Sequence, residues 1–346
     1  MTVTDVIRRR PRQADVAALA GVSQATVSTA LGTSPARASL SASTLERVAL
    51  AARTLGYVPD PVARRLAAQS TDLLGVYTFT DAFPVEVRDS YYPFLVGIER
   101  SAARLGYDLL LFTGTSSSRG GEAVQKVRLA DGCLFLGRHV PEEQLQQLLD
   151  AGYPVVYVGR RTELGGRLSY VGADYVAGAA QVVDHLAGLG HTALLYVRGT
   201  DDAVASADRE EGFWRAVAAA GLRGQVQRAY ASSIDARALQ SWRASGVTAV
   251  VTEENDANDL LAALLAAADD ADVAVPQEMS LAVLGESGGV ETAPRVTGFA
   301  LPRQQMGEDA AALLVDLVTG RRTGPVQELL VPSLLVGETT GPPPPA

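Results

Sequence analysis

The chain has 346 residues, which is too long for one small module and predicts two or three domains. Its hydrophobic content of 47% is ample for a buried core, yet no apolar run approaches the length of a membrane span and residues 1–20 lack the apolar centre of a signal peptide. The net charge is −9, and the single cysteine, Cys133, excludes an intramolecular disulfide and a cysteine-rich metal site.

The charge of the chain is unevenly distributed. Residues 1–70 hold nine arginines and four carboxylates, a net charge of +5, which leaves −14 for the remainder. A basic head of this kind can neutralise phosphates beside an acidic body. Within it, residues 8–12 (RRRPR) predict a disordered arm that adds phosphate contacts without reading sequence.

Residues 13–31 have the periodicity of two short helices that meet at a sharp turn. Gly21 can adopt the left-handed conformation that ends the first helix, and Ser23 is a good N-cap for the second. Small and apolar residues are placed to pack across the turn: Val16, Ala17, Ala20, Val22, Val27 and Leu31. This layout is typical of a DNA-binding helix-turn-helix, although an ordinary pair of packed helices fits the same pattern.

A third helix is predicted next, because Ser43 and Glu46 have the spacing of a capping box. Four residues give this helix its apolar stripe: Leu45, Val48, Ala52 and Leu55. Gly56 is placed to end it. Pro59, Asp60 and Pro61 then separate the head from a short helical segment, residues 62–68.

A family signature runs through these elements. Its residues are Asp15-Val16-Ala17, Ala20-Gly21-Val22-Ser23, Thr26-Val27-Ser28, Leu55-Gly56-Tyr57, Pro59 and Ala63-Arg64 with Leu66. With these residues the sequence resembles the LacI/GalR-type family of bacterial transcriptional repressors. Landmarks of the family continue toward the C-terminal end: Leu189-Gly190-His191, Arg209-Glu210-Glu211-Gly212-Phe213, Asn255-Asp256, Val275-Pro276, Met306-Gly307 and Glu338-Thr339-Thr340. The resemblance therefore covers nearly the whole chain.

The resemblance implies how the head binds DNA. Residues 62–68 would be a hinge helix that orders against its twin over the central minor groove, with Leu66 as a wedge that bends the duplex. The alternative is that Leu66 packs on the body. The residues that we assign to DNA contact are Ser23, Gln24, Ala25, Thr26, Ser28, Thr29, Tyr57, Arg64 and Leu66. Thr29 departs from the arginine that is usual in the family.

From Leu73 onward, apolar strands alternate with helices, which predicts parallel, doubly wound sheets. The predicted strands are residues 73–79, 107–112, 132–136, 155–158, 193–197, 247–252 and 280–284, and the clearest helices are 94–105, 142–151 and 177–188. Cys133 is expected to be a buried strand residue. The resemblance implies a periplasmic-binding-protein-like body of two such subdomains that close on a small ligand.

These observations together predict the domain organisation. The expected domains are a helix-turn-helix head at residues 1–58, a hinge at 59–70 and a body at 71–346. Within the body, we expect one subdomain at about 71–172 plus 303–330 and the other at about 173–302 plus 331–340. The fold class is therefore α/β with an all-α head.

One motif is typical of hydrolases: Gly285-Glu286-Ser287-Gly288-Gly289 matches their G-x-S-x-G nucleophile elbow. That fold requires a histidine after the serine, whereas all three histidines, at positions 139, 185 and 191, precede it. A Walker lysine and a metal-ligand spacing are also lacking. We therefore expect no catalytic residues, no metal and no cofactor.

The resemblance instead implies a binding site in the body. The residues assigned to effector contact are Tyr91, Tyr92, Arg160, Asp174, Arg209, Asn255 and Glu286. Arg209 matches an arginine that holds ligand hydroxyls or carboxylate with its planar fork, and Asp174 and Asn255 match acidic and amide contacts. Two alternatives remain: Arg209 pairs with a neighbouring acid, and the tyrosines belong to the core. Gly285 and Glu286 stand where the family often has an acidic pair, which weakens the prediction of a sugar.

The sequence thus predicts a cytoplasmic, homodimeric transcriptional repressor without a membrane segment. Its expected partners are double-stranded, pseudo-palindromic operator DNA and a small-molecule effector, with a sugar as the candidate, that controls operator affinity. The alternative is a cytoplasmic solute- or carbohydrate-sensing protein without regulatory DNA binding. The basic head and the lack of an export signal favour the repressor.

Overall fold

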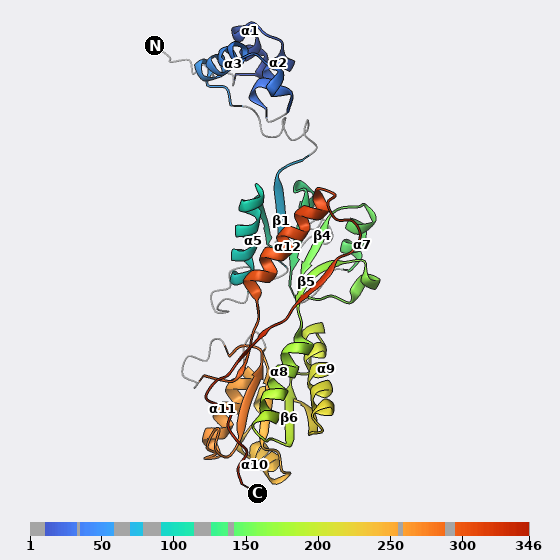
Figure 1. Ribbon diagram of the computed structural model, residues 1–346, viewed down its shortest axis with the longest axis vertical. Helices are drawn as coiled ribbons and strands as arrows, with labels where there is room; N and C mark the ends of the chain where they lie inside the picture. Colours follow the sequence, from blue (N-terminus) through green and yellow to red (C-terminus); the bar gives the residue numbers. More distant parts are fainter. Residues whose placement is uncertain are drawn as a thin grey trace, which may run out of the picture. The chain divides into compact units, whose positions relative to one another are not determined.

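The computed structural model describes residues 11–32, 35–58, 70–78, 91–113, 126–137, 142–254, 259–287 and 295–345. Contacts between residues divide the chain into two compact units, Met1–Thr71 and Asp72–Ala346. The first is a small helical unit and the second is a larger α/β unit (Figure 1). Among the described residues, no helix is both long and apolar enough to cross a membrane.

The helical unit, here called the head, contains the predicted helix-turn-helix. Its elements are α1 (Gln13–Ala20), α2 (Gln24–Leu31), the 3-10 helix η1 (Pro35–Ser39) and α3 (Ala42–Leu55). Gly21 ends α1 with a φ of 65°, a left-handed conformation that glycine adopts without a Cβ penalty. The hydroxyl of Ser23 accepts a hydrogen bond from the backbone N–H of Thr26 at 3.1 Å and so caps α2. Both predictions for the turn are confirmed.

The core of the head joins all three α-helices. Its buried residues are Val16, Ala17, Ala20, Val27, Ala30, Val48, Ala51 and Ala52. Most of these side chains are small, so the helices can pack closely. The predicted cap of the third helix was wrong, because α3 begins at Ala42 and the hydroxyl of Ser41, not Ser43, accepts the bond from the N–H of Thr44 at 3.3 Å.

The larger unit, here called the body, contains a six-stranded parallel sheet in the order β11-β5-β4-β3-β1-β2. Its strands are β1 (Leu73–Thr78), β2 (Asp108–Thr113), β3 (Gly132–Leu136), β4 (Val155–Val158), β5 (Ser169–Ala173) and β11 (Gln327–Leu330). Two helices, α5 (Tyr92–Leu105) and α12 (Arg303–Val318), contribute residues to one core with it, and α7 (Glu142–Asp150) contributes to a second core. Two short 3-10 helices, η3 (Lys126–Leu129) and η4 (Glu163–Gly166), lie between strands.

Helices α5 and α12 cross at two glycines, although they lie far apart in the sequence. A Cβ atom on Gly97 would lie 2.0 Å from the carbonyl oxygen of Gln304, and one on Gly307 would lie 2.2 Å from that of Phe94. Any larger residue at either position would therefore push the two helices apart. This close crossing fixes α12 against α5.

The second sheet of the body is parallel and four-stranded, in the order β7-β6-β8-β9. Its strands are β6 (Ala193–Arg198), β7 (Arg223–Arg228), β8 (Ala249–Glu253) and β9 (Ser280–Leu284). Alternate residues of β6 face two cores, one shared with α8 (Tyr175–Gly188) and α9 (Val204–Ala219) and the other with α10 (Ala236–Ala244) and α11 (Asp259–Asp270). Helices therefore cover both faces (Figure 1). This arrangement confirms the predicted fold class.

The chain runs between the two sheets three times: from β5 to α8, from β10 (Gly298–Ala300) to α12, and from β11 to β12 (Ser333–Leu335). β10 and β12 pair with each other in antiparallel fashion, and the 3-10 helix η5 (Ala231–Ser233) follows β7. These crossings bring the start of α8 and the start of α12 near the carboxyl ends of the strands. In open α/β sheets that is the edge where ligands bind.

Candidate functional site

The candidate DNA-binding surface lies on α2 of the head. Ser23, Gln24, Ala25 and Ser28 are exposed, whereas Thr26 and Thr29 are partly buried. The hydroxyl of Thr29 donates a hydrogen bond to the carbonyl oxygen of Ala25 at 3.0 Å, within its own helix. Thr29 can therefore present its methyl group to the major groove of DNA, together with a hydroxyl oxygen that can still accept a hydrogen bond.

The other residues assigned to DNA contact are Tyr57, Arg64 and Leu66. Tyr57 is half-buried against the core of the head, and its backbone N–H donates to the carbonyl of Ala52 at 2.8 Å. Arg64 and Leu66 lie outside the described residues. The predicted hinge helix and its wedge therefore stay predictions.

Arg209, on α9, is the candidate effector residue with the most unusual surroundings. Its side chain is buried, with 5% of the residue exposed, and its guanidinium carbon lies 4.2 Å from the centre of the Tyr175 ring. Its Nε has no hydrogen-bond partner among the described residues. Those residues also provide no carboxylate within ion-pair distance of Arg209, so the alternative of a structural ion pair finds no support in them. A buried donor without a partner is costly, and a bound ligand would satisfy it.

Arg160 and Asp208 form an ion pair next to Arg209. Arg160 follows β4 of the six-stranded sheet, Asp208 lies on α9, and their atoms Nη1 and Oδ1 are 2.7 Å apart. Burial raises the pKa of Asp208 although Arg160 opposes this shift, and the nearby charge of Asp174 adds to it. Asp174 itself caps α8, because its Oδ1 accepts from the N–H of Ala177 at 2.9 Å. Three of the assigned residues, Arg160, Asp174 and Arg209, are thus close together.

Glu286 belongs to a second group, which is centred on Arg303 at the start of α12. The Nη1 of Arg303 lies 2.6 Å from Oε1 of Glu286, and its Nη2 lies 2.5 Å from Oε1 of Glu254. Glu286 also accepts a hydrogen bond from the N–H of Leu301 at 2.8 Å. Burial alone would lower the pKa of Arg303, but the two carboxylates raise it. Arg303 is therefore held as a cation between two acids, at one of the crossings between the sheets.

Tyr175 connects the two groups. Arg209 covers its ring, and Tyr175 lies close enough to Arg303 to help raise the pKa of that guanidinium. The ring also lies 6.3 Å from that of Phe299, on β10. The site thus combines guanidinium donors, carboxylate acceptors and an aromatic ring at the carboxyl ends of the strands.

The remaining assigned residues are less informative. Tyr91 precedes α5 and packs against the core of the six-stranded sheet, which favours the alternative of a core residue, whereas Tyr92 is 59% exposed. Asn255 lies outside the described residues. Sequence reasoning missed four residues of the site, namely Tyr175, Asp208, Glu254 and Arg303. Tyr175, Asp208 and Glu254 carried a weak signal, since each is the immediate neighbour of an assigned residue, whereas Arg303 carried none.

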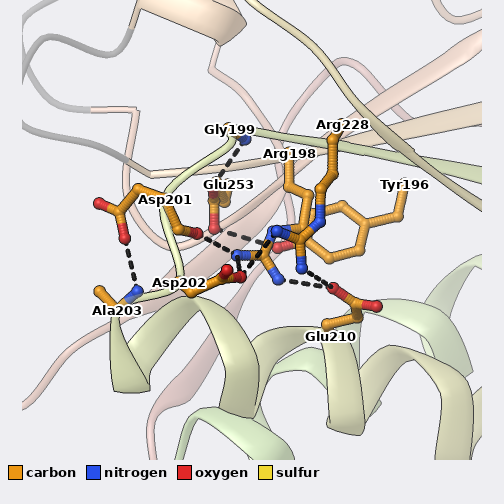
Figure 2. Close-up of polar contacts among 9 residues, drawn as sticks. All are labelled: Tyr196, Arg198, Gly199, Asp201, Asp202, Ala203, Glu210, Arg228 and Glu253. Atoms are coloured by element: carbon orange, nitrogen blue, oxygen red, sulfur yellow. Dashed lines mark hydrogen bonds and ion pairs between the residues drawn. The ribbon is translucent and has the colours of Figure 1, made fainter.

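A further network, around Arg198, holds the loop that leads into α9. Arg198 is 1% exposed, and its Nη1 lies 2.5 Å from Oε2 of Glu210. Arg228 joins it from β7, since its Nη1 lies 2.7 Å from Oδ1 of Asp202 (Figure 2). Burial alone would lower the pKa of Arg198, but Glu210 and Glu253 raise it. Unlike Arg209, Arg198 has a carboxylate partner among the described residues.

We expect Arg198→Leu to lower the free energy of unfolding of the body by about 3 kcal/mol, because a buried charge network loses its central cation. Chemical denaturation followed by circular dichroism measures this. The matched control is Arg215→Leu, which removes an exposed arginine that pairs with Glu211 on α9. The control should change the free energy by less than about 0.5 kcal/mol. Equal midpoints for the two variants would show that the Arg198 network contributes no more than a surface ion pair.

Chemistry other than binding finds no support in the described part of the chain. In that part, no group of three or more His, Cys, Asp or Glu side chains is arranged to hold a metal ion. Of the two histidines described, His191 is buried and His185 is half-buried, and both bond to residues of the C-terminal segment. They serve the packing of that segment.

Comparisons with known proteins agree with the division of the chain into a helical head and an α/β body. The family described as bacterial regulatory proteins, lacI family, matches residues 14–60, and the periplasmic binding protein-like domain matches residues 183–340. The HTH-type transcriptional regulator CelR of Thermobifida fusca is 32% identical and covers 96% of this chain and 99% of its own length. GalR of Escherichia coli is 27% identical over 93% of each chain.

Solved structures show the same relationship. A complex of the transcriptional regulator CelR with cellobiose has a TM-score of 0.64 at 29% identity and covers 95% of this chain and all of that one. A lac repressor dimer bound to operator and the anti-inducer ONPF has a TM-score of 0.70 at 20% identity, which shows the shared fold. These relatives are regulators and not enzymes, so the rejection of a hydrolase is confirmed. The chain belongs to the LacI family of bacterial DNA-binding transcriptional regulators.

Proposed function

We propose that the chain is a homodimeric repressor whose affinity for a pseudo-palindromic operator is controlled by a sugar bound in the body. The observation that carries the effector site is Arg209, a buried guanidinium that stacks on Tyr175 and leaves its Nε without a partner among the described residues. The relative CelR, of known structure with cellobiose, supports a sugar as the ligand class.

The chemistry of the site also fits a sugar. A polyhydroxylated ligand both donates and accepts hydrogen bonds, so it needs carboxylates as well as guanidinium groups. Arg209 supplies donors, whereas Asp174 and Glu254 supply acceptors near Tyr175, whose ring can pack on the apolar face of a sugar. The ion pairs of Arg160 and Arg303 would fix the neighbouring side chains before the ligand arrives.

In this proposal residues 1–58 form the head, 59–70 the hinge and 71–346 the body, and the protein works in the cytoplasm, where its operator is. Each protomer places α2 in the major groove of one half-site. Ligand binding at the crossings between the sheets would change how the two hinges pair over the central base step. A solute-sensing protein without regulatory DNA binding would not need the head.

Random-site selection with the purified full-length chain tests the proposal. We expect a two-fold symmetric consensus with a flexible central step, and an operator affinity that changes when cellobiose or another sugar is added. Gel-shift titration at a fixed salt concentration measures both effects, because nonspecific binding depends strongly on salt. Selection of no consensus would contradict operator binding, and an affinity that no sugar alters would contradict the effector class.

Thr29→Arg is expected to change the base that the half-site specifies. Threonine is too short for a bidentate contact to guanine, and its hydroxyl already donates to Ala25, so its methyl group suits thymine. An arginine could contact guanine in bidentate fashion, with a discrimination of about 1–3 kcal/mol. Random-site selection with both proteins should therefore return half-sites that differ at one position. Identical half-sites would show that residue 29 reads no base.

A further inference from the structure

Glu254 occupies the space that a side chain at position 285 would need. Gly285 follows β9 with a φ of 146°, and a Cβ built on it would lie 2.4 Å from both Cβ and Oε2 of Glu254. The two residues come from the carboxyl ends of neighbouring strands, β8 and β9. Because Gly285 has no side chain, the carboxylate of Glu254 can lie directly over its backbone. Position 285 thus lacks an acid of its own, and the neighbouring strand supplies one at the same place.

The carboxylate of Glu254 is fixed but not saturated. Its Oε1 binds Arg303 at 2.5 Å, and its Oε2 accepts from the N–H of Glu286 at 3.2 Å. Each carboxylate oxygen has two lone pairs, so each can accept one more hydrogen bond. The side chain is 18% exposed, which leaves it accessible to a small molecule. A ligand hydroxyl can therefore bind Glu254 without breaking the ion pair with Arg303.

The charges around this carboxylate favour an uncharged ligand. Arg303 carries one positive charge against the two negative charges of Glu254 and Glu286. Nearby, Arg160 and Asp208 pair with opposite charges, and Arg209 and Asp174 add one charge of each sign without forming an ion pair with each other. The described residues of the site therefore have an excess of one negative charge, and Tyr175 lies near both Arg303, which the carboxylates hold, and Arg209. An anionic ligand at this place would be repelled, whereas hydroxyl groups would find acceptors.

We propose that Glu254 determines the specificity of the effector site, by accepting hydrogen bonds from a neutral polyhydroxylated sugar and by rejecting its phosphorylated or carboxylated counterparts. This inference rests on the proposed function, because it deepens the chemistry of the same site. It assigns the discriminating carboxylate to the end of β8 and not to residue 285. It also separates neutral sugars from sugar phosphates and sugar acids as ligand classes.

Isothermal titration of the full-length chain at pH 7 tests this assignment with four probes: cellobiose, glucose, cellobionate and glucose 6-phosphate. We expect at least one neutral sugar to bind about tenfold more tightly than its anionic counterpart, and Glu254→Gln to weaken that neutral sugar about tenfold or more. The same variant should reduce the preference for the neutral ligand. A purely structural role for Glu254 would lower all affinities together and leave their ratio unchanged.

The matched control is Glu278→Gln, which neutralises a carboxylate that pairs with Arg243 at 2.7 Å. Glu278 precedes the first residue of β9 and so lies at the opposite end of that strand from residue 285. The control should leave all four affinities unchanged. Glu254→Asp keeps the charge, so it should keep the preference for neutral ligands even where it lowers affinity, and thermal unfolding without ligand shows whether each variant is folded. If Glu254→Gln binds the neutral sugar as tightly as the wild-type chain does, the role of Glu254 is overturned, while the proposed sugar effector stands. A wild-type chain that binds none of the probes contradicts the sugar effector itself and this inference with it.

Discussion

A chain shortened to residues 72–346 is expected to lose specific operator binding by a factor of about a thousand or more while it keeps its effector affinity. The residues removed include α2, which carries the exposed polar face of the helix-turn-helix. They also include all nine arginines of the basic head, so that the remaining body has a charge of −14 and repels phosphates. The cut falls at the boundary between the two compact units, so the body keeps its own contacts.

Gel-shift titration with the selected operator measures the loss, and calorimetry with the same sugar measures the affinity that should persist. The full-length chain serves as the control in both measurements. Specific operator binding by the shortened chain would mean that the body reads DNA. Loss of both activities, with the body still folded by circular dichroism, would instead show that the head contributes to the effector site.

Arg209→Ala is expected to weaken effector binding about a hundredfold and to leave operator affinity without effector nearly unchanged. The change removes charge-assisted hydrogen bonds to the ligand, which typically contribute a few kcal/mol. Within the described residues the guanidinium has no carboxylate partner, so the alanine would break no ion pair there and would lose the stacking on Tyr175. The variant protein should therefore remain folded.

Calorimetry with the sugar identified for the wild-type chain checks this expectation. Arg215→Ala is the matched control, because Arg215 lies on the same helix, is 69% exposed and pairs with Glu211. An Arg209→Ala chain that binds the sugar as tightly as the control would assign Arg209 a role in packing only. If Arg209→Ala lowers the operator affinity that is measured in the absence of effector, Arg209 takes part in the coupling between the body and the head.

Three strands, β3, β4 and β9, were predicted to the residue, and all three are buried along their whole length. Burial alone does not define the ends of a strand, because β6 and β8 are equally buried and their predicted ends are off by one or two residues. β7 was missed, because its residues RGQVQR are mostly polar and it lies at an edge of its sheet. Its place follows from pairing with β6, a contact between distant segments that no local pattern contains.

The candidate site was predictable to the extent that single residues carry signals. Arg209 stands in a family landmark, whereas the equally buried Arg198 gave no sequence signal, and only the structure shows that it has a carboxylate partner, Glu210. The contact between Glu254 and Arg303 joins residues 49 positions apart, at the ends of different elements. The match of Glu254 to the space over Gly285 depends on three-dimensional packing, which a sequence without its fold does not reveal.

The close crossing of α5 and α12 has a consequence for how the protein is made. On the ribosome, the residues of β1 to β5 emerge early, but the core that they form also needs α12, which supplies buried residues such as Met306 and Leu314. The chain meanwhile continues through β6 to β9 and their covering helices, which complete the four-stranded sheet first. Synthesis proceeds from the N-terminus, and domains fold as units as they become complete. The sheet that comes first in the sequence is therefore the last to be closed.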